Sequence, residues 1–198
     1  MNAADEAKKK AILREQALAR RKSLTEEERA AATAVIAERA AGFIGPLRPA
    51  SVALYWAVRS ECGTQSLIER LQASGAEIGL PAVVDGGGLA FRRYMPGDRL
   101  EDAAFAIREP LPSAPALSPD LVVLPVVGFD RGGMRLGYGR GHYDFAISQM
   151  RGAGRQPLLA GIAFSVQEVE TIPAEPHDVR LDCIVTENET LEFRTTRG

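Results

Sequence analysis

The first forty residues show a helical pattern without strand-like alternation. From Asp5 to Lys22 the chain is rich in Ala, Leu, Lys, Arg and Glu and contains no Gly or Pro, so it consists of good helix formers. Ser23–Glu26 and Thr25–Glu28 both match the capping box that opens a helix. We therefore predict one helix over 5–22 and a second that begins at this box and ends near Gly42.

From residue 51 onward, short apolar runs alternate with polar segments. Two further helices are expected, one capped by Thr64 and running through Leu71, the other from His142 to Met150. The segment Asp85–Gly88 is a hairpin signal between two of the expected strands. The expected strands cover residues 51–57, 76–84, 89–94, 121–129, 158–164 and 181–186. Strands that alternate with helices predict an α/β sandwich with a largely parallel central sheet.

The segment Glu109–Pro119 is rich in proline. Proline removes backbone donors and restricts the residue before it, so we expect an irregular surface connection here. Each flank of this segment is small, and the whole chain of 198 residues fits one compact domain, 1–198.

Composition excludes several classes of protein. With 45% hydrophobic and 25% charged residues the chain is neither disordered nor fibrous, and a formal net charge of −2 gives no general attraction to nucleic acid or membrane. The two cysteines, Cys62 and Cys183, form no metal-spaced pair. No signal peptide or apolar membrane span is visible in the sequence. We expect a cytoplasmic protein that acts as a monomer, without nucleic-acid or membrane partners.

The chemistry is concentrated in a glycine-rich segment, Gly128–Asp144. Its glycines allow positive φ values, and successive N–H groups can converge on an anion where the loop opens into a helix. Arg131, Arg135 and Arg140 are interleaved with them and can bind phosphate oxygens. Asp144, just inside the helix, could hold Mg²⁺ against those phosphates.

The same pattern leaves two interpretations open. The spacing Gly137-x-Gly139-x-Gly141 is not that of a dinucleotide fingerprint, and the Gly-Lys-Ser/Thr of a Walker loop is absent. A structural tight turn therefore stays possible beside phosphate binding. The apolar strand that precedes the loop favours binding, because ligands of α/β sheets lie beyond the carboxyl ends of strands.

This segment resembles the signature of the 5-formyltetrahydrofolate cyclo-ligase family, through Phe129-Asp130, Gly133 and Arg135–Asp144. Weaker matches follow the family's order over nearly the whole chain: Lys10–Arg14, Glu61–Thr64, Ile107–Pro110, Pro173–Asp178, Leu181-Asp182 and Thr186-Glu187. The resemblance implies a three-layer α/β/α sandwich, in agreement with the strand and helix pattern.

The resemblance also implies a reaction. ATP would phosphorylate the formyl oxygen of 5-formyltetrahydrofolate, a folate nitrogen would attack the activated carbon, and 5,10-methenyltetrahydrofolate, ADP and phosphate would be released. Such chemistry needs positioning and charge neutralisation more than a side-chain nucleophile. The lack of a catalytic serine or cysteine motif is therefore compatible with it.

Site residues follow from the same resemblance, position by position. The ATP site would comprise Lys10, Arg14, Arg135, Leu136, Gly137, Tyr138, Gly139, Arg140, Gly141, His142 and Tyr143. Lys10, Arg135 and Tyr143 would be catalytic, and Asp144 and Asp182 would hold Mg²⁺. Trp56 and Glu61 would contact the folate, whose flat pterin with N–H donors suits an aromatic face and a carboxylate.

Three residues depart from the family's pattern and affect the expected nucleotide contacts. His142 replaces the first of two aromatics, Arg140 stands where glycine or lysine is common, and Phe145 stands where a basic residue is frequent.

Purely structural roles remain possible for several of these residues. Trp56 could pack in the core, Glu61 could cap the helix near Thr64, and Asp182 could be a turn carboxylate. For the remaining candidates we prefer structural roles: a small buried filler for Cys62, a loop hydrogen bond for His177 and Asp178, and solvation for Lys8 and Lys9. Two rival functions also stay open, namely another small-molecule kinase with the same loop, or a non-catalytic folate or nucleotide sensor.

Overall fold

The computed structural model describes residues 3–84, 88–103, 107–176 and 178–193. The helices are α1 (Ala3–Ser23), α2 (Glu26–Ile44), α3 (Gln65–Ala73) and α4 (His142–Gly152), with 3-10 turns η1 (Gly45–Leu47) and η3 (Ser165–Gln167). The strands are β1 (Ser51–Ala53), β2 (Glu77–Val84), β3 (Gly88–Arg93), β4 (Leu100–Asp102), β5 (Arg108–Pro110), β6 (Ala116–Leu117), β7 (Leu121–Pro125), β8 (Gly128–Phe129), β9 (Arg135–Leu136), β10 (Leu158–Ile162), β11 (Cys183–Val185) and β12 (Thr190–Glu192).

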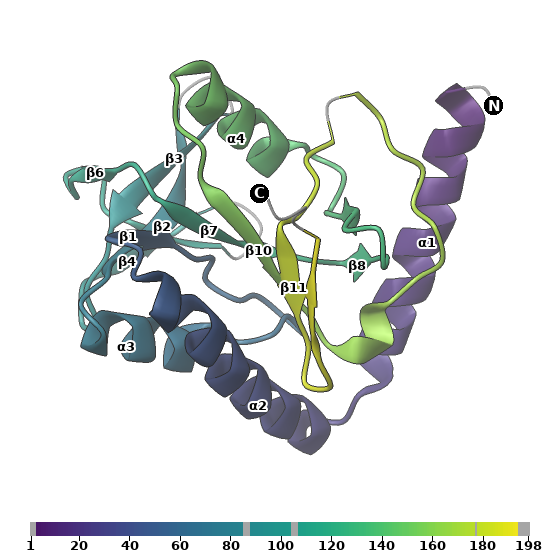
Figure 1. Cartoon of the computed structure of the whole chain (residues 1–198), viewed down its shortest axis with the longest axis horizontal. Coiled ribbons are helices and arrows are strands. Elements are labelled where there is room, and N and C mark those ends of the chain that lie inside the picture. The colour runs from purple at the N-terminus through teal and green to yellow at the C-terminus, as the bar shows by residue number, and fades with distance from the viewer. Residues whose placement is uncertain (1–2, 85–87, 104–106, 177, 194–198) are drawn as a thin grey trace.

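One eight-stranded sheet, in the order β12-β11-β10-β7-β1-β2-β3-β6, forms the centre of the molecule (Figure 1). Its five inner strands, from β11 to β2, are parallel to one another. The outer strands β12, β3 and β6 pair antiparallel. The predicted α/β fold with a largely parallel sheet is therefore confirmed.

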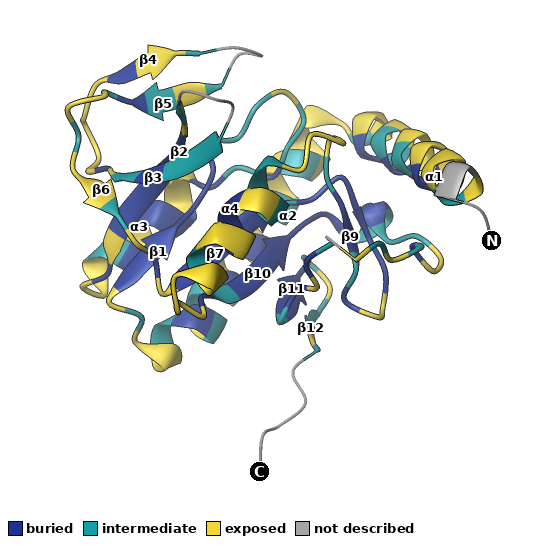
Figure 2. Cartoon of the chain, turned by 90° about the horizontal axis from the view of Figure 1, so that it is seen from above, coloured by how far each residue is buried: buried dark blue, intermediate teal, exposed yellow. Residues whose placement is uncertain are grey.

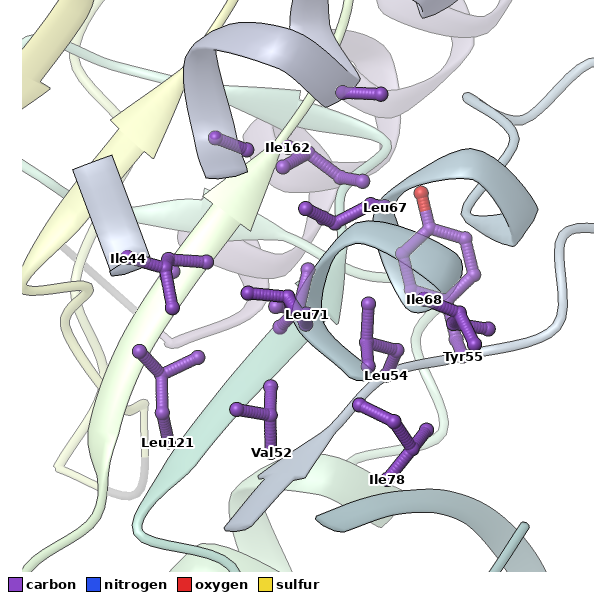
Figure 3. Packing of buried hydrophobic residues seen from close by; sticks show 14 of the residues in the cluster. Ile44, Val52, Leu54, Tyr55, Leu67, Ile68, Leu71, Ile78, Leu121 and Ile162 are labelled. Carbon is purple, nitrogen blue, oxygen red and sulfur yellow. The ribbon is translucent and has the colours of Figure 1, made fainter. Parts of the chain in front are cut away.

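Alternate residues of the inner strands face two separate apolar cores. Leu121 and Val123 of β7 belong to the core beneath α2 and α3, part of which Figure 3 shows around Leu71 and Ile44. Val122 and Leu124 belong to the opposite core, which Ile147 of α4 covers. This two-sided burial produces the three layers, and it explains why β7 reads as an unbroken apolar run. Figure 2 shows the buried residues gathered in the sheet, with exposed outer sides on the helices.

Helix α1 lies outside these layers, beside β8 and the chain that follows β10 (Figure 1). Leu13 and Ala17 of α1 form a third small core with Val127, Leu136 and Ile172. The approach is close, since a Cβ added at Gly128 would lie 3.2 Å from the Cβ of Ala17. Small residues on both elements thus bring α1 directly against the glycine-rich segment.

The structure selects one of the two capping boxes and corrects the expected cap of α3. Thr25 caps α2, with its hydroxyl accepting from the Glu28 N–H while the Glu28 side chain accepts from the Thr25 N–H. Ser23 instead donates to the carbonyl of Arg20. Thr64 precedes α3 but does not cap it with its side chain, because its hydroxyl donates to the Tyr55 carbonyl at 2.6 Å.

Several strand predictions differ from the structure. The expected strand 121–129 is divided into β7 and β8, and β4 and β9 were not predicted. β1 ends at Ala53, four residues earlier than expected, because the chain turns away into the loop that Thr64 closes. Within the proline-rich segment, β5 and β6 form short strands at sheet edges, where proline is tolerated. β12, which pairs with β11, was not predicted. The expected turn at 85–87 lies outside the described residues.

None of the described helices is both long and apolar enough to cross a membrane.

Candidate active site

The candidate site lies beyond the carboxyl ends of β1 and β7, which are neighbours in the sheet. Residues 54–64 follow β1, and the glycine-rich segment follows β7. In parallel sheets this edge is where ligands bind. Helix α1 covers the glycine-rich segment, so three parts of the chain meet at one place.

The first half of the glycine-rich segment is a rigid β8–β9 ribbon built around Asp130. One carboxylate oxygen of Asp130 accepts from the N–H groups of Gly132 and Met134, and the other accepts from Ile172 N–H at 2.9 Å. The side chain is therefore fully engaged in holding the ribbon to the segment beside α1, which is a structural role.

The second half leads into α4 with an open helix start. Gly139 and Gly141 have φ values of +87° and +67°, a region that favours glycine. Gly141 is the N-cap of α4 and supplies no side chain to the free N–H groups of the first turn. Such a helix start can receive an anion. His142 is the first residue of α4, while Arg140 is exposed before it.

Three cations lie on the side of α1 that faces this segment: Lys10, Arg14 and Arg21. Their spacing with buried Ala17 follows the helical repeat. Arg14 Nε donates to the Gly137 carbonyl at 2.7 Å, and its guanidinium lies 3.8 Å from where a Cβ on Gly139 would be. Leu136 faces α1 in the third core, so only its backbone can meet a ligand. Lys8 and Lys9 are exposed, as expected.

Lys10 is buried and bound by two carboxylates. Its ammonium donates to Asp178 at 2.6 Å and also to Glu175. Burial lowers the pKa of Lys10, but the hydrogen bonds and charges of Asp178 and Glu175 outweigh it, so the pKa is raised above its ordinary value. In the free protein the ammonium charge of Lys10 is therefore already compensated by Glu175 and Asp178.

Arg135 and Asp144 form a nearly buried ion pair. Arg135 Nη2 donates to Asp144 Oδ1 at 2.8 Å, and Val179 N–H donates to the same oxygen at 3.2 Å. Arg135 Nε is buried and has no hydrogen-bond partner among the described residues. A buried donor without a partner is uncommon and marks a place for a further acceptor.

Glu61 faces the glycine-rich segment and does not cap α3. Its Oε2 accepts from Val58 N–H at 2.9 Å, and its Oε1 accepts from the hydroxyl of Tyr138 at 2.7 Å. The Tyr138 hydroxyl in turn accepts from Arg21 Nη2 at 2.9 Å. Glu61 and the loop expected to hold ATP are thus in direct contact.

Trp56 and Tyr143 border the site with partly buried rings. Trp56 meets Tyr94 edge-on at 5.8 Å and Arg108 over its face at 5.8 Å, and it packs against the first core. Tyr143 packs against Phe91, with ring centroids 6.4 Å apart. Burial, and then the charge of Glu61, raise the pKa of Tyr143 well above its ordinary value. Its phenol therefore keeps its proton at neutral pH.

Asp182 lies apart from this arrangement. It precedes β11, and its carboxylate accepts from Leu159 N–H at 2.8 Å beside the start of β10. This geometry favours the alternative of a structural carboxylate. Asp178 is linked to Asp144 through the chain, because Asp178 binds Lys10 and the N–H of the next residue, Val179, donates to Asp144.

Glu175 and Asp178, which bind Lys10, are candidate site residues that were not predicted from the sequence. The preferred loop hydrogen bond of Asp178 is present, since Glu175 N–H donates to its carboxylate at 2.8 Å, but the ion pair with Lys10 was not expected. The acidic spacing within Pro173–Asp178 was the available signal. His177 lies outside the described residues. Cys62 is buried, and burial raises the pKa of its thiol to about 12, in keeping with a filler.

The residues beside the glycine-rich segment fit a Mg²⁺ ion that arrives with nucleotide phosphates. Asp144 Oδ1 accepts both bonds that the described residues donate to this side chain, which leaves Oδ2 for a cation. Mg²⁺ is usually held by one or two carboxylates together with phosphate oxygens. Within the described parts of the chain no group of three or more His, Cys, Asp or Glu side chains could form an all-protein cage.

Comparison with known proteins agrees with this geometry. Residues 6–187 match the model of the 5-formyltetrahydrofolate cyclo-ligase family. The chain is 31% identical over 180 residues to the 5-formyltetrahydrofolate cyclo-ligase of Escherichia coli K12, covering 88% of this chain and 98% of that protein. The 5,10-methenyltetrahydrofolate synthetase of Aquifex aeolicus superposes with a TM-score of 0.81 at 29% identity, covering 96% and 95% of the two chains. That of Mycoplasma pneumoniae gives 0.73 at 26% identity, covering 90% and 98%.

Proposed function

The chain belongs to the 5-formyltetrahydrofolate cyclo-ligase family and is a ligase of 5-formyltetrahydrofolate, and we propose that it drives ring closure with ATP and Mg²⁺. The observation that carries the proposal is the position of the α1 cations over the glycine-rich segment, with Glu61 at the same edge of the sheet. A phosphate donor and a folate can therefore be held side by side.

The nucleotide phosphates lie at the glycine-rich segment in this proposal. The N-terminus of α4, Arg14 and the unpartnered Nε of Arg135 supply donors to the phosphate oxygens. Mg²⁺, when bound, neutralises charge on the transferring phosphoryl group. Asp144 would hold this ion. As a second ligand of the ion, Asp178 is better placed than Asp182, because Asp178 binds Lys10 while Asp182 binds the start of β10.

The folate lies against the loop that follows β1. Glu61 accepts N–H donors of the pterin, and Trp56 borders it with an aromatic face. The formyl oxygen then attacks the γ-phosphate and ADP departs. The neighbouring N10 of the folate, outside the pterin ring, attacks the activated carbon and loses its proton, and phosphate leaves as the new ring closes. The protonated phenol of Tyr143 serves as a hydrogen-bond donor in this scheme and not as a base.

Lys10 needs a change of partner to act on the γ-phosphate. In the free protein its ammonium is bound by Glu175 and Asp178. A Mg²⁺ ion that took Asp178 as a ligand would leave the ammonium free to turn to a phosphate oxygen. We expect the reaction to take place in the cytoplasm and to need no other macromolecule.

Coupled turnover tests the proposal. Methenyltetrahydrofolate is followed by its long-wave absorbance, and phosphate release is followed in parallel, with 5-formyltetrahydrofolate, ATP and Mg²⁺ each omitted in turn. Equal amounts of both products, and neither when one component is missing, are expected. ATP hydrolysis without folate, or transfer to another acceptor, would favour the rival phosphotransferase. Binding of both ligands without product would favour a sensor.

A further inference from the structure

Tyr138 joins three parts of the site through one hydroxyl. The hydroxyl accepts from Arg21 Nη2 on α1 at 2.9 Å and donates to Glu61 Oε1 in the loop after β1 at 2.7 Å. Tyr138 itself lies in the glycine-rich segment, between Gly137 and Gly139. Its ring covers the guanidinium of Arg21, with Cζ 5.9 Å from the ring centroid.

Arg21 is a buried cation whose donors are not all used. The residue is 2% exposed, and its Nε donates to Ser60 Oγ at 3.1 Å. Its Nη1 is buried without a hydrogen-bond partner among the described residues. Leaving a charged donor unpaired inside a protein is costly, so an acceptor that enters here would be bound favourably.

Tyr138 is the movable member of this group. The residue is 43% exposed, and the next residue, Gly139, has a φ of +87°. Arg21, in contrast, is held on a helix whose neighbouring turns are packed in the third core. Burial, and then Glu61, raise the pKa of Tyr138 to about 12, so the hydroxyl keeps the proton that it donates to Glu61.

The hydroxyl of Tyr138 offers one acceptor to Arg21 and one donor to Glu61. The lactam edge of a pterin offers the same pair, since a ring carbonyl lies beside a ring N–H. Glu61 and Arg21 together are therefore complementary to that edge. In the free protein the phenol occupies the positions that these two groups would take.

We propose that Arg21 is a folate-binding residue and that Tyr138 is a gate which the pterin displaces. The lactam N–H replaces the phenol on Glu61, and the lactam carbonyl accepts from Arg21, including the unpartnered Nη1. This inference rests on the proposed function, because it takes 5-formyltetrahydrofolate as the ligand. It adds Arg21 to the site and makes the tyrosine a competitor of the substrate.

Binding of 5-formyltetrahydrofolate, measured by calorimetry without ATP, tests the two roles through changes of opposite sign. Tyr138→Phe keeps the ring but removes the competing hydroxyl, so affinity should rise by about threefold to tenfold. Arg21→Lys keeps the charge but loses the planar fork, so affinity should fall by about tenfold or more. Arg20→Lys is the matched control: its guanidinium binds the carbonyls of Val166 and Glu168, away from Glu61, and affinity should not change.

A second probe identifies the contact. 5-Formyl-6-methyltetrahydropterin carries the lactam edge but lacks the glutamate tail, and both variants should shift its affinity as they shift that of the folate. Changes seen only with the full folate would assign Arg21 to the glutamate carboxylates and overturn the lactam contact.

Two further results would show whether Tyr138 is a gate. Weaker binding in Tyr138→Phe would make the phenol a fixed part of the folate site and remove the gate. Because Tyr138 is on a partly exposed loop, this variant stays informative even if Arg21→Lys fails to fold. Turnover of the wild-type protein is measured alongside. If both variants change the affinity as expected but the wild type forms no methenyl product, the proposed reaction is wrong and the gate is supported. If the wild type forms product but neither variant changes the affinity for the folate, the gate is wrong and the proposed reaction is supported.

Discussion

Lys10 Nζ lies 2.6 Å from Oδ2 of Asp178, a residue 168 positions further along the chain. The pair ties α1 to the segment that follows β10 and η3, and it brings the first cation of the site beside one of its carboxylates. Both side chains are largely buried, at 10% and 18% exposure. The contact therefore contributes to the fold as well as to the site.

Replacing Lys10 by Met should cost both stability and activity. The change leaves Glu175 and Asp178 facing each other without a cation, and breaking such a pair typically costs about 3 kcal/mol or more. Urea unfolding measures the stability, and coupled turnover measures the activity. Lys9→Met is the control on the same helix, because Lys9 is exposed; it should match the wild type. Equal effects in the two variants would contradict a specific role for Lys10.

Asp144→Asn and Asp182→Asn should behave differently. Loss of the Asp144 charge weakens the proposed metal ligand and leaves buried Arg135 without its counter-charge, so activity should fall by about 10²–10³-fold, with partial rescue at high Mg²⁺. Asp182→Asn retains an oxygen that can accept from Leu159 N–H, so turnover should stay near that of the wild type. Both variants are assayed over a range of Mg²⁺ concentrations. An inactive Asp182→Asn variant that folds normally would restore Asp182 as a metal ligand.

Gly139→Ala should destabilise the free protein. With φ at +87°, alanine adds roughly 1–2 kcal/mol of strain. An added Cβ would be 3.8 Å from the guanidinium of Arg14, an ordinary contact, so strain and not collision with the protein is the expected cause. The melting temperature is measured with and without ATP. An unchanged melting temperature together with loss of ATP-induced stabilisation would point instead to a steric block of the nucleotide.

The tyrosines should titrate late when the pH is raised. Burial is the first cause of a raised pKa at Tyr55, Tyr94, Tyr138 and Tyr143, and for Tyr138 the value reaches about 12. Unfolded tyrosine loses its proton near pH 10. The folded state holds its phenol protons longer, so this contribution to stability is complete below about pH 10 and is lost as the pH rises toward 12. Phenolate absorbance of the folded chain, compared with the chain in urea, measures the difference; a normal titration in the folded chain would refute it.

Much of the fold could be predicted because its signals are local. Three examples are the unbroken apolar run of β7, the capping box of Thr25 and Glu28, and the glycines before α4. Each of these patterns fixes the conformation of residues only a few positions away in the sequence. The glycines of the glycine-rich segment were expected to allow positive φ values, and Gly139 and Gly141 adopt them. Lys10, Arg14 and the glycine-rich segment could be assigned to the site from the sequence, whereas Arg21 could not.

The contacts between distant parts of the chain depend on strand order and on the path of the chain, which only the tertiary structure shows. No local pattern indicates that Lys10 meets Asp178, that Arg21 lies beneath Tyr138, or that Asp182 binds the start of β10. These contacts join residues more than twenty positions apart, and they exist only because β1, β7 and β10 are neighbours and α1 folds back over β8. Local sequence specified the helices, most of the central strands and the residue types of the site, because hydrogen bonding and apolar periodicity act over short distances along the chain. The pairing of those residues was decided by packing, because burial of the apolar faces sets which segments meet.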